Sequence, residues 1–130
     1  MPTSTIAIPP APEHVRVVRM VAGAAARRAR VPAEQVDEVR LAVGEAVARV
    51  VLRHRAAGVV ADVVVALRDD PASFEVEITD CTSADLADAD DGLSVALTEA
   101  LAPHSSVRPA ADGSQHIRLV WPLEEDRAAD

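Results

Sequence analysis

Aromatic residues are scarce in this chain: they make up 2% of it, with one Phe, one Trp and no Tyr. Because hydrophobic residues still account for 49% of the sequence, the core must be built from Val, Ala and Leu. A single cysteine, Cys81, excludes an internal disulfide and suits a reducing compartment. No apolar run approaches the roughly 18 residues that a membrane-spanning helix needs, so no membrane association is expected.

Lysine is also missing: all 13 basic residues are arginines, against 21 acidic ones, for a formal net charge of −8. Nucleic acid is not an expected partner, because binding its phosphates requires a positively charged face. The 130 residues suffice for one domain that buries roughly two-thirds of its unfolded surface. Met1–Pro12 lacks the basic start of a signal peptide and is rich in proline, so a cytoplasmic location is expected.

Hydrophobic periodicity predicts the order of the elements. Residues 4–8 are expected to form a strand, residues 13–30 a helix, and residues from Pro32 to about Arg55 a longer helix. Strands at 59–67 and 74–79 follow, joined by a turn at Asp69–Pro71; then come a helix at 92–101, a short strand around Val107, and a strand at 115–121 after a turn at Asp112–Gly113. This order predicts an α+β two-layer sandwich with helices on one face of a mixed, mainly antiparallel sheet.

The second of these helices carries the most informative pattern. An apolar stripe recurs along it at steps of three and four residues, formed by Val36, Val39, Val43, Ala46, Val47, Val50 and His54. Glu45 lies off this stripe, in line with Leu41, Arg49 and Leu52, at an edge of the helix that could face a pocket. For His54, a place in the core or as a helix cap is favoured over catalysis.

Glu45–Ala46 and the surrounding helix resemble the signature helix of the GHKL (Bergerat-fold, histidine-kinase-like) ATPases, and specifically the anti-sigma regulatory factors that are serine-protein kinases. The order of elements is similar to the family's, and Ile117–Leu123 resembles the last strand of its actinobacterial-type members. The resemblance implies a histidine-kinase-like ATPase domain over residues 1–123 with an acidic tail at 124–130. It also implies that Glu45 is the family's general base, which we expect to be inactive here.

Arg49 stands where the family has the asparagine that holds magnesium. A guanidinium has hydrogen-bond donors but no lone pair to offer a metal. Three interpretations of Arg49 stay open: an ion pair with Glu45, one helical turn away, that closes the pocket; direct binding of phosphate; or contact with a partner.

The two other nucleotide motifs of the family are incomplete. Asp80 matches the aspartate that receives the adenine amino group, but Cys81–Ala84 replaces the glycines that follow it. The alternative interpretation is that Asp80 caps the strand and begins a turn. The phosphate-binding turn keeps Gly92 and has Ser94 in place of its second glycine. The eleven residues between Asp80 and Gly92 include four aspartates. Their charges would repel a triphosphate; the alternative is that they form a solvated loop. The spacing of Asp88, Asp90 and Glu99 weakly resembles a calcium loop, but no metal site is expected there.

Arg16 and Arg19 lie on the polar face of the first helix. In the kinase-type anti-sigma factors, an arginine on this helix contacts both the sigma factor and the antagonist that displaces it. Arg19 is the nearest positional match, and Arg16 lies one turn earlier. The alternative is that both are surface arginines of a polar helix face.

Two functions are therefore considered. The favoured one is an anti-sigma-factor-like regulator of bacterial transcription, which sequesters a sigma factor or a STAS-type antagonist through protein contacts (partner switching). Its ATP site, formed by Arg49, Asp80 and Gly92, is degenerate, and no cofactor is expected. The alternative is an ATP-dependent serine/threonine kinase that phosphorylates the antagonist, with ATP and magnesium bound. Family members usually pair, so the resemblance also implies a homodimer.

Overall fold

The computed structural model describes residues 2–83, 91–102 and 104–124, and of residues 91–94 the backbone alone. Within these residues the strands are β1 (Thr3–Ile8), β2 (Val63–Asp70), β3 (Ser73–Asp80), β4 (His104–Pro109) and β5 (Gln115–Pro122). They form one sheet in the order β1-β2-β3-β5-β4, and every pairing is antiparallel. The prediction of a mixed sheet was therefore wrong in detail, because the described strands contain no parallel pair.

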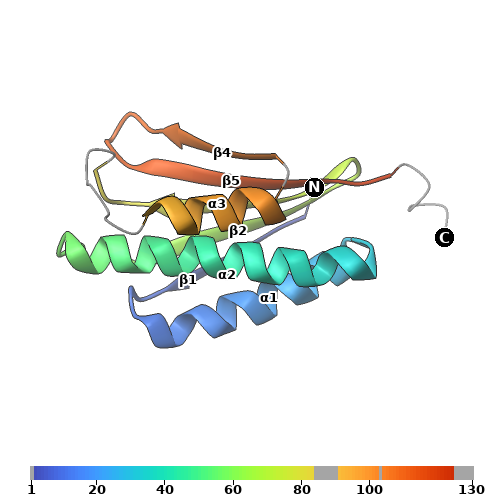
Figure 1. Cartoon of the computed structure of the whole chain (residues 1–130), viewed down its shortest axis with the longest axis horizontal. Helices are drawn as coiled ribbons and strands as arrows, with labels where there is room; N and C mark the ends of the chain where they lie inside the picture. Colours follow the sequence, from blue (N-terminus) through green and yellow to red (C-terminus); the bar gives the residue numbers. More distant parts are fainter. Residues whose placement is uncertain (1, 84–90, 103, 125–130) are drawn as a thin grey trace.

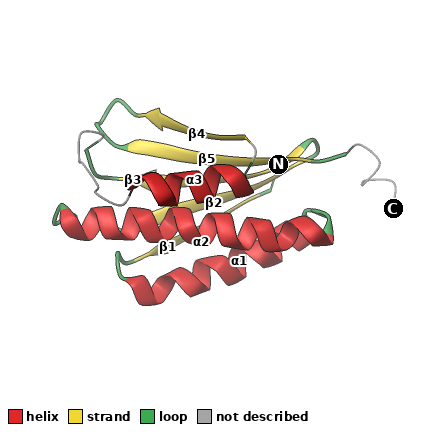
Figure 2. Cartoon of the chain, in the orientation of Figure 1, coloured by secondary structure: helices red, strands yellow, loops and turns green. Residues whose placement is uncertain are grey.

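Three helices in the described residues cover one face of this sheet: α1 (Val15–Arg28), α2 (Ala33–Ala56) and α3 (Asp91–Leu101). Helix α2 runs between α1 and α3, and it is the longest of the three (Figures 1 and 2). The predicted α+β two-layer arrangement is confirmed. In the described residues no helix has the length and apolarity that a membrane span requires.

The core lies between the helical layer and the inner face of the sheet. All seven positions of the apolar stripe predicted for α2 are buried, including His54 at 0% exposure. In β3, strict alternation turns Phe74, Val76 and Ile78 inward. The Phe74 ring packs near that of Trp121, with ring centroids 6.3 Å apart, and the Trp121 Nε1 donates a hydrogen bond to the Leu101 carbonyl at 3.2 Å. The two large aromatic residues thus join β3 and β5 to the end of α3.

Several element boundaries differ from the prediction. The first helix begins with a 3-10 turn at Pro12–His14, and α1 ends at Arg28 rather than at residue 30. The strand expected at 59–67 begins only at Val63 and extends to Asp70, because the chain turns at Gly58, whose φ is +69°, and needs residues 59–62 to reach the sheet. The tight turn between β2 and β3 consequently lies after Asp70.

Candidate functional site

Asp80, the last residue of β3, is completely buried and accepts four hydrogen bonds from described residues. Arg53 donates to its Oδ2 through Nε at 2.8 Å, and Gln115 donates to the same oxygen through Nε2 at 3.1 Å. The backbone N–H and the hydroxyl of Thr82 donate to its Oδ1 at 2.9 and 2.6 Å. Both carboxylate oxygens are therefore occupied by groups of the protein itself.

Arg53 is the partner that the sequence analysis missed. It lies on the inner side of α2 with 3% exposure, and its Nη2 also donates to the Ser83 carbonyl at 2.9 Å. A signal for it exists in the sequence: Arg53 follows Val50 by three positions and Ala46 by seven, so it lies on the apolar face of α2. A buried arginine needs an acidic partner, because an unpaired charge is costly to bury.

His54, the next residue of α2, connects the end of the helix to the loop after β3. Its Nδ1 lies 3.1 Å from the Ala61 carbonyl oxygen, and its Nε2 accepts the backbone N–H of Cys81 at 3.0 Å. A carbonyl oxygen can only accept, so this pattern assigns the ring hydrogen to Nδ1. The core role predicted for His54 is confirmed, and its nitrogens face the protein interior.

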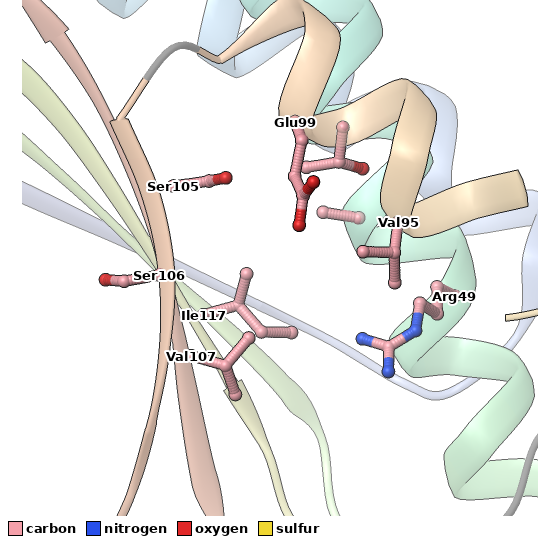
Figure 3. Close-up of a pocket in the computed structure, with 9 residues that line it drawn as sticks. Arg49, Val95, Glu99, Ser105, Ser106, Val107 and Ile117 are labelled. Carbon is pink, nitrogen blue, oxygen red and sulfur yellow. The ribbon is translucent and has the colours of Figure 1, made fainter. Parts of the chain in front are cut away.

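A pocket of about 100 Å³ opens between α2, α3, β4 and β5 (Figure 3), and Asp80, Arg53 and His54 are not among its lining residues. Its lining combines apolar and polar side chains and consists of Ala46, Arg49, Val95, Thr98, Glu99, Ser105, Ser106, Val107 and Ile117. Arg49 and Glu99 enter it from the helices, whereas Ile117 and Val107 enter it from the strands (Figure 3). A second hollow, of about 320 Å³, lies where α1 ends and α2 begins and contains none of the predicted nucleotide-site residues.

The remaining residues predicted for a nucleotide site are spread over this region. Arg49 is half-buried and lines the pocket, whereas Glu45, also half-buried, is not among the lining residues. Among ion pairs between described side chains, none joins Glu45 to Arg49. Gly92 lies in the first turn of α3. The acidic stretch that includes Asp88 and Asp90 lies outside the described residues.

No group of three or more His, Cys, Asp or Glu in the described part of the chain could hold a metal ion. Cys81, which directly follows Asp80, is exposed. Partial burial raises the pKa of its thiol, and the negative charges of Asp80 and Asp112 raise it further. The lone thiol is therefore a poor nucleophile near neutral pH, because only the thiolate reacts.

The arginines predicted to contact partners lie elsewhere, on α1. Arg16 and Arg19 are both exposed. The stem of Arg19 crosses onto α2 and lies over Gly44, where a Cβ would be only 2.6 Å from the Arg19 Cδ. The structure thus separates two groups of residues: a buried polar cluster around Asp80, and an exposed arginine surface on the pair of helices α1 and α2.

This fold also occurs in a known protein family and in solved structures. The family model for the histidine kinase-like ATPase domain matches residues 8–121. The crystal structure of the RsbU and RsbW domains of Rv1364c from Mycobacterium tuberculosis is similar, with a TM-score of 0.69 and 18% identity over 92% of this chain and 32% of that chain. The structure of the SiaB–SiaC complex from Pseudomonas aeruginosa is also similar, with a TM-score of 0.63 and 11% identity over 92% of this chain and 89% of that chain.

This chain therefore spans about a third of the length of the Mycobacterium tuberculosis chain. No curated protein matches it in sequence. At 18% and 11% identity, the two structural similarities establish the fold.

Proposed function

We propose that this chain, which belongs to the family of the histidine kinase-like ATPase domain, is an anti-sigma-factor-like regulator that sequesters partner proteins. The reason is that its own Arg53 side chain donates a hydrogen bond to Asp80, which stands where the family has its adenine-binding aspartate. The proposed partners are a sigma factor, a STAS-type antagonist, or both, and the proposed location is the bacterial cytoplasm. ATP and magnesium have no part in this function.

The buried pair of Arg53 and Asp80 carries the proposal. In the family, the aspartate at this position receives the adenine amino group. Here a ligand would have to displace the Arg53 Nε, which lies 2.8 Å from the Asp80 Oδ2, and leave a guanidinium buried without its carboxylate. Breaking a buried ion pair in this way costs about 3–5 kcal/mol, which corresponds to more than a hundredfold in affinity.

The other nucleotide-binding features support the same conclusion. Arg49 cannot ligate the magnesium that the family's asparagine holds. The pocket that Arg49 lines measures about 100 Å³, whereas pockets for drug-sized ligands and cofactors are usually roughly 300–1,000 Å³. Each lost ligand or added side chain lowers nucleotide affinity further, by about tenfold for every 1.4 kcal/mol.

Helix α1 has the properties of a protein-binding surface. It carries four arginines and no acidic residue, in a chain whose net charge is −8. Large apolar side chains lie exposed among these arginines, with Met20 at 68% and Val17 at 45% exposure. Arginine flanked by exposed apolar groups is typical of the residues that dominate binding energies. The similar Pseudomonas aeruginosa structure is a complex of two proteins, which is in keeping with a partner-binding role.

The test compares partner binding with phosphotransfer. Each purified sigma factor and STAS-type protein of the source bacterium is titrated calorimetrically with the wild-type chain, Arg19→Ala and Glu45→Ala, and the wild type is titrated separately with ATP and Mg²⁺. We expect one of these proteins to bind, Arg19→Ala to weaken that binding at least tenfold, and Glu45→Ala to leave it unchanged. ATP should give no binding heat at millimolar concentration.

The opposite result would support the kinase alternative, for which the retained Glu45 is the favourable observation. Transfer of labelled phosphate from ATP to one of these proteins by the wild-type chain, lost in Glu45→Ala, would overturn the proposal. In that case Arg19→Ala would alter the affinity for the substrate protein and Glu45→Ala the turnover.

A further inference from the structure

The contact between α1 and α2 contains two matched pairs of an arginine and a glycine. At Gly44 of α2, a Cβ would lie 2.6 Å from the Cδ and 2.8 Å from the Cγ of Arg19, which belongs to α1. At Gly23 of α1, a Cβ would lie 2.8 Å from the Cδ and 3.0 Å from the Cγ of Arg40, which belongs to α2. Each helix therefore leaves space at a buried glycine for the stem of an arginine from the other helix.

The two arginines differ in what their guanidinium groups contact. Arg40 pairs with Asp37 on its own helix. Arg19 is exposed, and among the described residues its guanidinium has neither a hydrogen bond nor an ion pair. Contact with Gly44 thus holds the stem of Arg19 while its charged end is left to the solvent.

Holding the stem matters for binding. A long side chain loses conformational freedom when it is immobilised in an interface, and this loss lowers affinity. The Cγ and Cδ of Arg19 already lie against the α2 backbone before any partner arrives. The guanidinium can therefore form a bidentate contact with a carboxylate at a smaller entropic cost.

The surroundings of Arg19 indicate the chemistry of the partner. Arg16 lies one helical turn before it, Met20 next to it is 68% exposed, and Leu41, three residues before Gly44 on α2, is 50% exposed. These four residues, Arg16, Arg19, Met20 and Leu41, are called the Arg19 face. Its positive charge on a chain of net charge −8 complements an acidic protein surface that also presents apolar side chains.

From these contacts we infer that Gly44 is a positioning residue: it holds Arg19 outward so that the Arg19 face binds an acidic, partly apolar surface of a partner protein. The inference rests on the proposed function and adds to it the residue that orients the binding arginine. Gly44 acts on binding indirectly. Any side chain at this position displaces the stem of Arg19, and this displacement changes the affinity for the partner.

The matched variants are Gly44→Ala and Gly23→Ala, since each adds one methyl group to the same pair of helices and displaces one arginine. Binding is titrated with the sigma factor or STAS-type protein that the wild-type chain binds. We expect Gly44→Ala to weaken binding by about three- to tenfold, the effect of freeing one long side chain. Gly23→Ala should change the affinity for the partner by less than about twofold, because the guanidinium of Arg40 already forms an ion pair with Asp37.

A double-mutant cycle separates positioning from a steric effect. On the Arg19→Ala background, Gly44→Ala should have no further effect, because the side chain that it displaces is absent. NMR relaxation of the arginine Nε–H groups gives a readout without any partner. The Arg19 signal should be ordered in the wild type and in Gly23→Ala, and mobile in Gly44→Ala.

The outcomes distinguish the inference from the proposed function. If Arg19→Ala weakens binding while Gly44→Ala does not, or if both glycine variants weaken it equally, the positioning role of Gly44 is overturned and the proposed function stands. A mobile Arg19 in the wild type also overturns the positioning role. If Arg19→Ala leaves binding intact, or if none of these proteins binds, the proposed function and the inference fail together.

Discussion

Arg53 joins α2 to the end of β3, and in the proposed function it is the group that a nucleotide would have to displace. Its guanidinium is 3% exposed and pairs with the fully buried carboxylate of Asp80. Gln115 and Thr82 supply the other hydrogen bonds that Asp80 accepts, so the pair is satisfied in the interior. Asp80 stands where the family has the aspartate that binds adenine, and in this chain it connects the end of β3 to α2 through Arg53.

Removing either partner of this pair should destabilise the protein strongly. We expect Arg53→Ala to lower the free energy of unfolding by about 3–5 kcal/mol, because Asp80 would be left as a buried charge without its cation. Asp80→Ala should also be destabilising, and the double variant Arg53→Ala/Asp80→Ala should cost less than the sum of the two single changes. Urea unfolding of the four proteins measures this coupling, and a loss below about 1 kcal/mol for Arg53→Ala would contradict the buried pair.

The thiol of Cys81 should react slowly and only at raised pH. Its pKa is raised first by partial burial and then by the charges of Asp80 and Asp112, so less thiolate is present at any given pH than in an ordinary cysteine. The rate of alkylation by iodoacetamide, followed by mass spectrometry, should rise with pH along a curve shifted to higher pH than that of a cysteine peptide.

A charge change provides the control for this prediction. Asp112→Asn removes one of the negative charges that disfavour the thiolate, so it should shift the alkylation curve of Cys81 toward lower pH. An alkylation curve that coincides with that of the cysteine peptide, or one that Asp112→Asn shifts to higher pH, would show that these charges do not act on the thiol.

The two long helices end in the same way. After α1, the N–H groups of Arg30 and Val31 donate to the carbonyls of Arg27 and Ala26, at 3.0 Å in both cases. After α2, Gly58 and Val59 donate to Arg55 and His54, at 3.2 and 2.8 Å. Both ends are Schellman motifs, which require a left-handed residue just after the helix. Arg30 has a φ of +64° and Gly58 one of +69°.

Gly58→Ala should destabilise the protein through the backbone alone. A Cβ at Gly58 meets nothing within 4 Å, so no clash contributes, whereas an L-residue in the left-handed region costs about 1 kcal/mol. Gly58→Asn should cost less, since asparagine tolerates this conformation better. Thermal and urea unfolding measure both variants. If Gly58→Ala is as stable as the wild type, the left-handed turn after α2 does not limit the stability of the fold.

At the scale of the whole molecule, the outer face of the sheet and helix α1 differ in how their charged side chains are paired. On the outer face of the sheet, Glu77 lies within 3.5–3.7 Å of side-chain nitrogens of Arg68, Arg108 and His116, and Glu75 pairs with Arg118. Acidic and basic side chains there offset one another. Helix α1 on the opposite side has arginines without acidic residues, although the chain as a whole carries a net charge of −8.

Partner binding should therefore weaken as salt is added. The Debye length falls from about 10 Å at 0.1 M to about 3 Å at 1 M salt, which screens the attraction between exposed arginines and an acidic partner. We expect the Kd measured by calorimetry to rise at least about fivefold between 50 and 500 mM NaCl, mainly through a slower association rate. The Arg19→Ala variant should show a shallower dependence. An affinity that does not change with salt would point to an apolar contact on another surface.

Much of the candidate site could be predicted because its signals are local. The departures from the family's motifs at Arg49 and after Asp80 are visible in the sequence itself, and so are the arginines of the first helix, which the structure leaves exposed. Arg53 could also have been found, since it lies on the apolar face of α2. Its partner could not, because Asp80 lies 27 positions further along the chain and several other carboxylates were available.

The sequence by itself determined the layered α+β fold, the buried stripe of α2 and the degenerate nucleotide motifs, because periodicity, turn residues and side-chain chemistry act over a few neighbouring positions. Only the tertiary structure decided which groups meet across elements. The angle at which α2 packs on the sheet places Arg53 against Asp80, and the close approach of α1 and α2 places Arg19 over Gly44. Such contacts depend on packing between distant segments, where a shift of about one ångström breaks a hydrogen bond and leaves no trace in any local pattern.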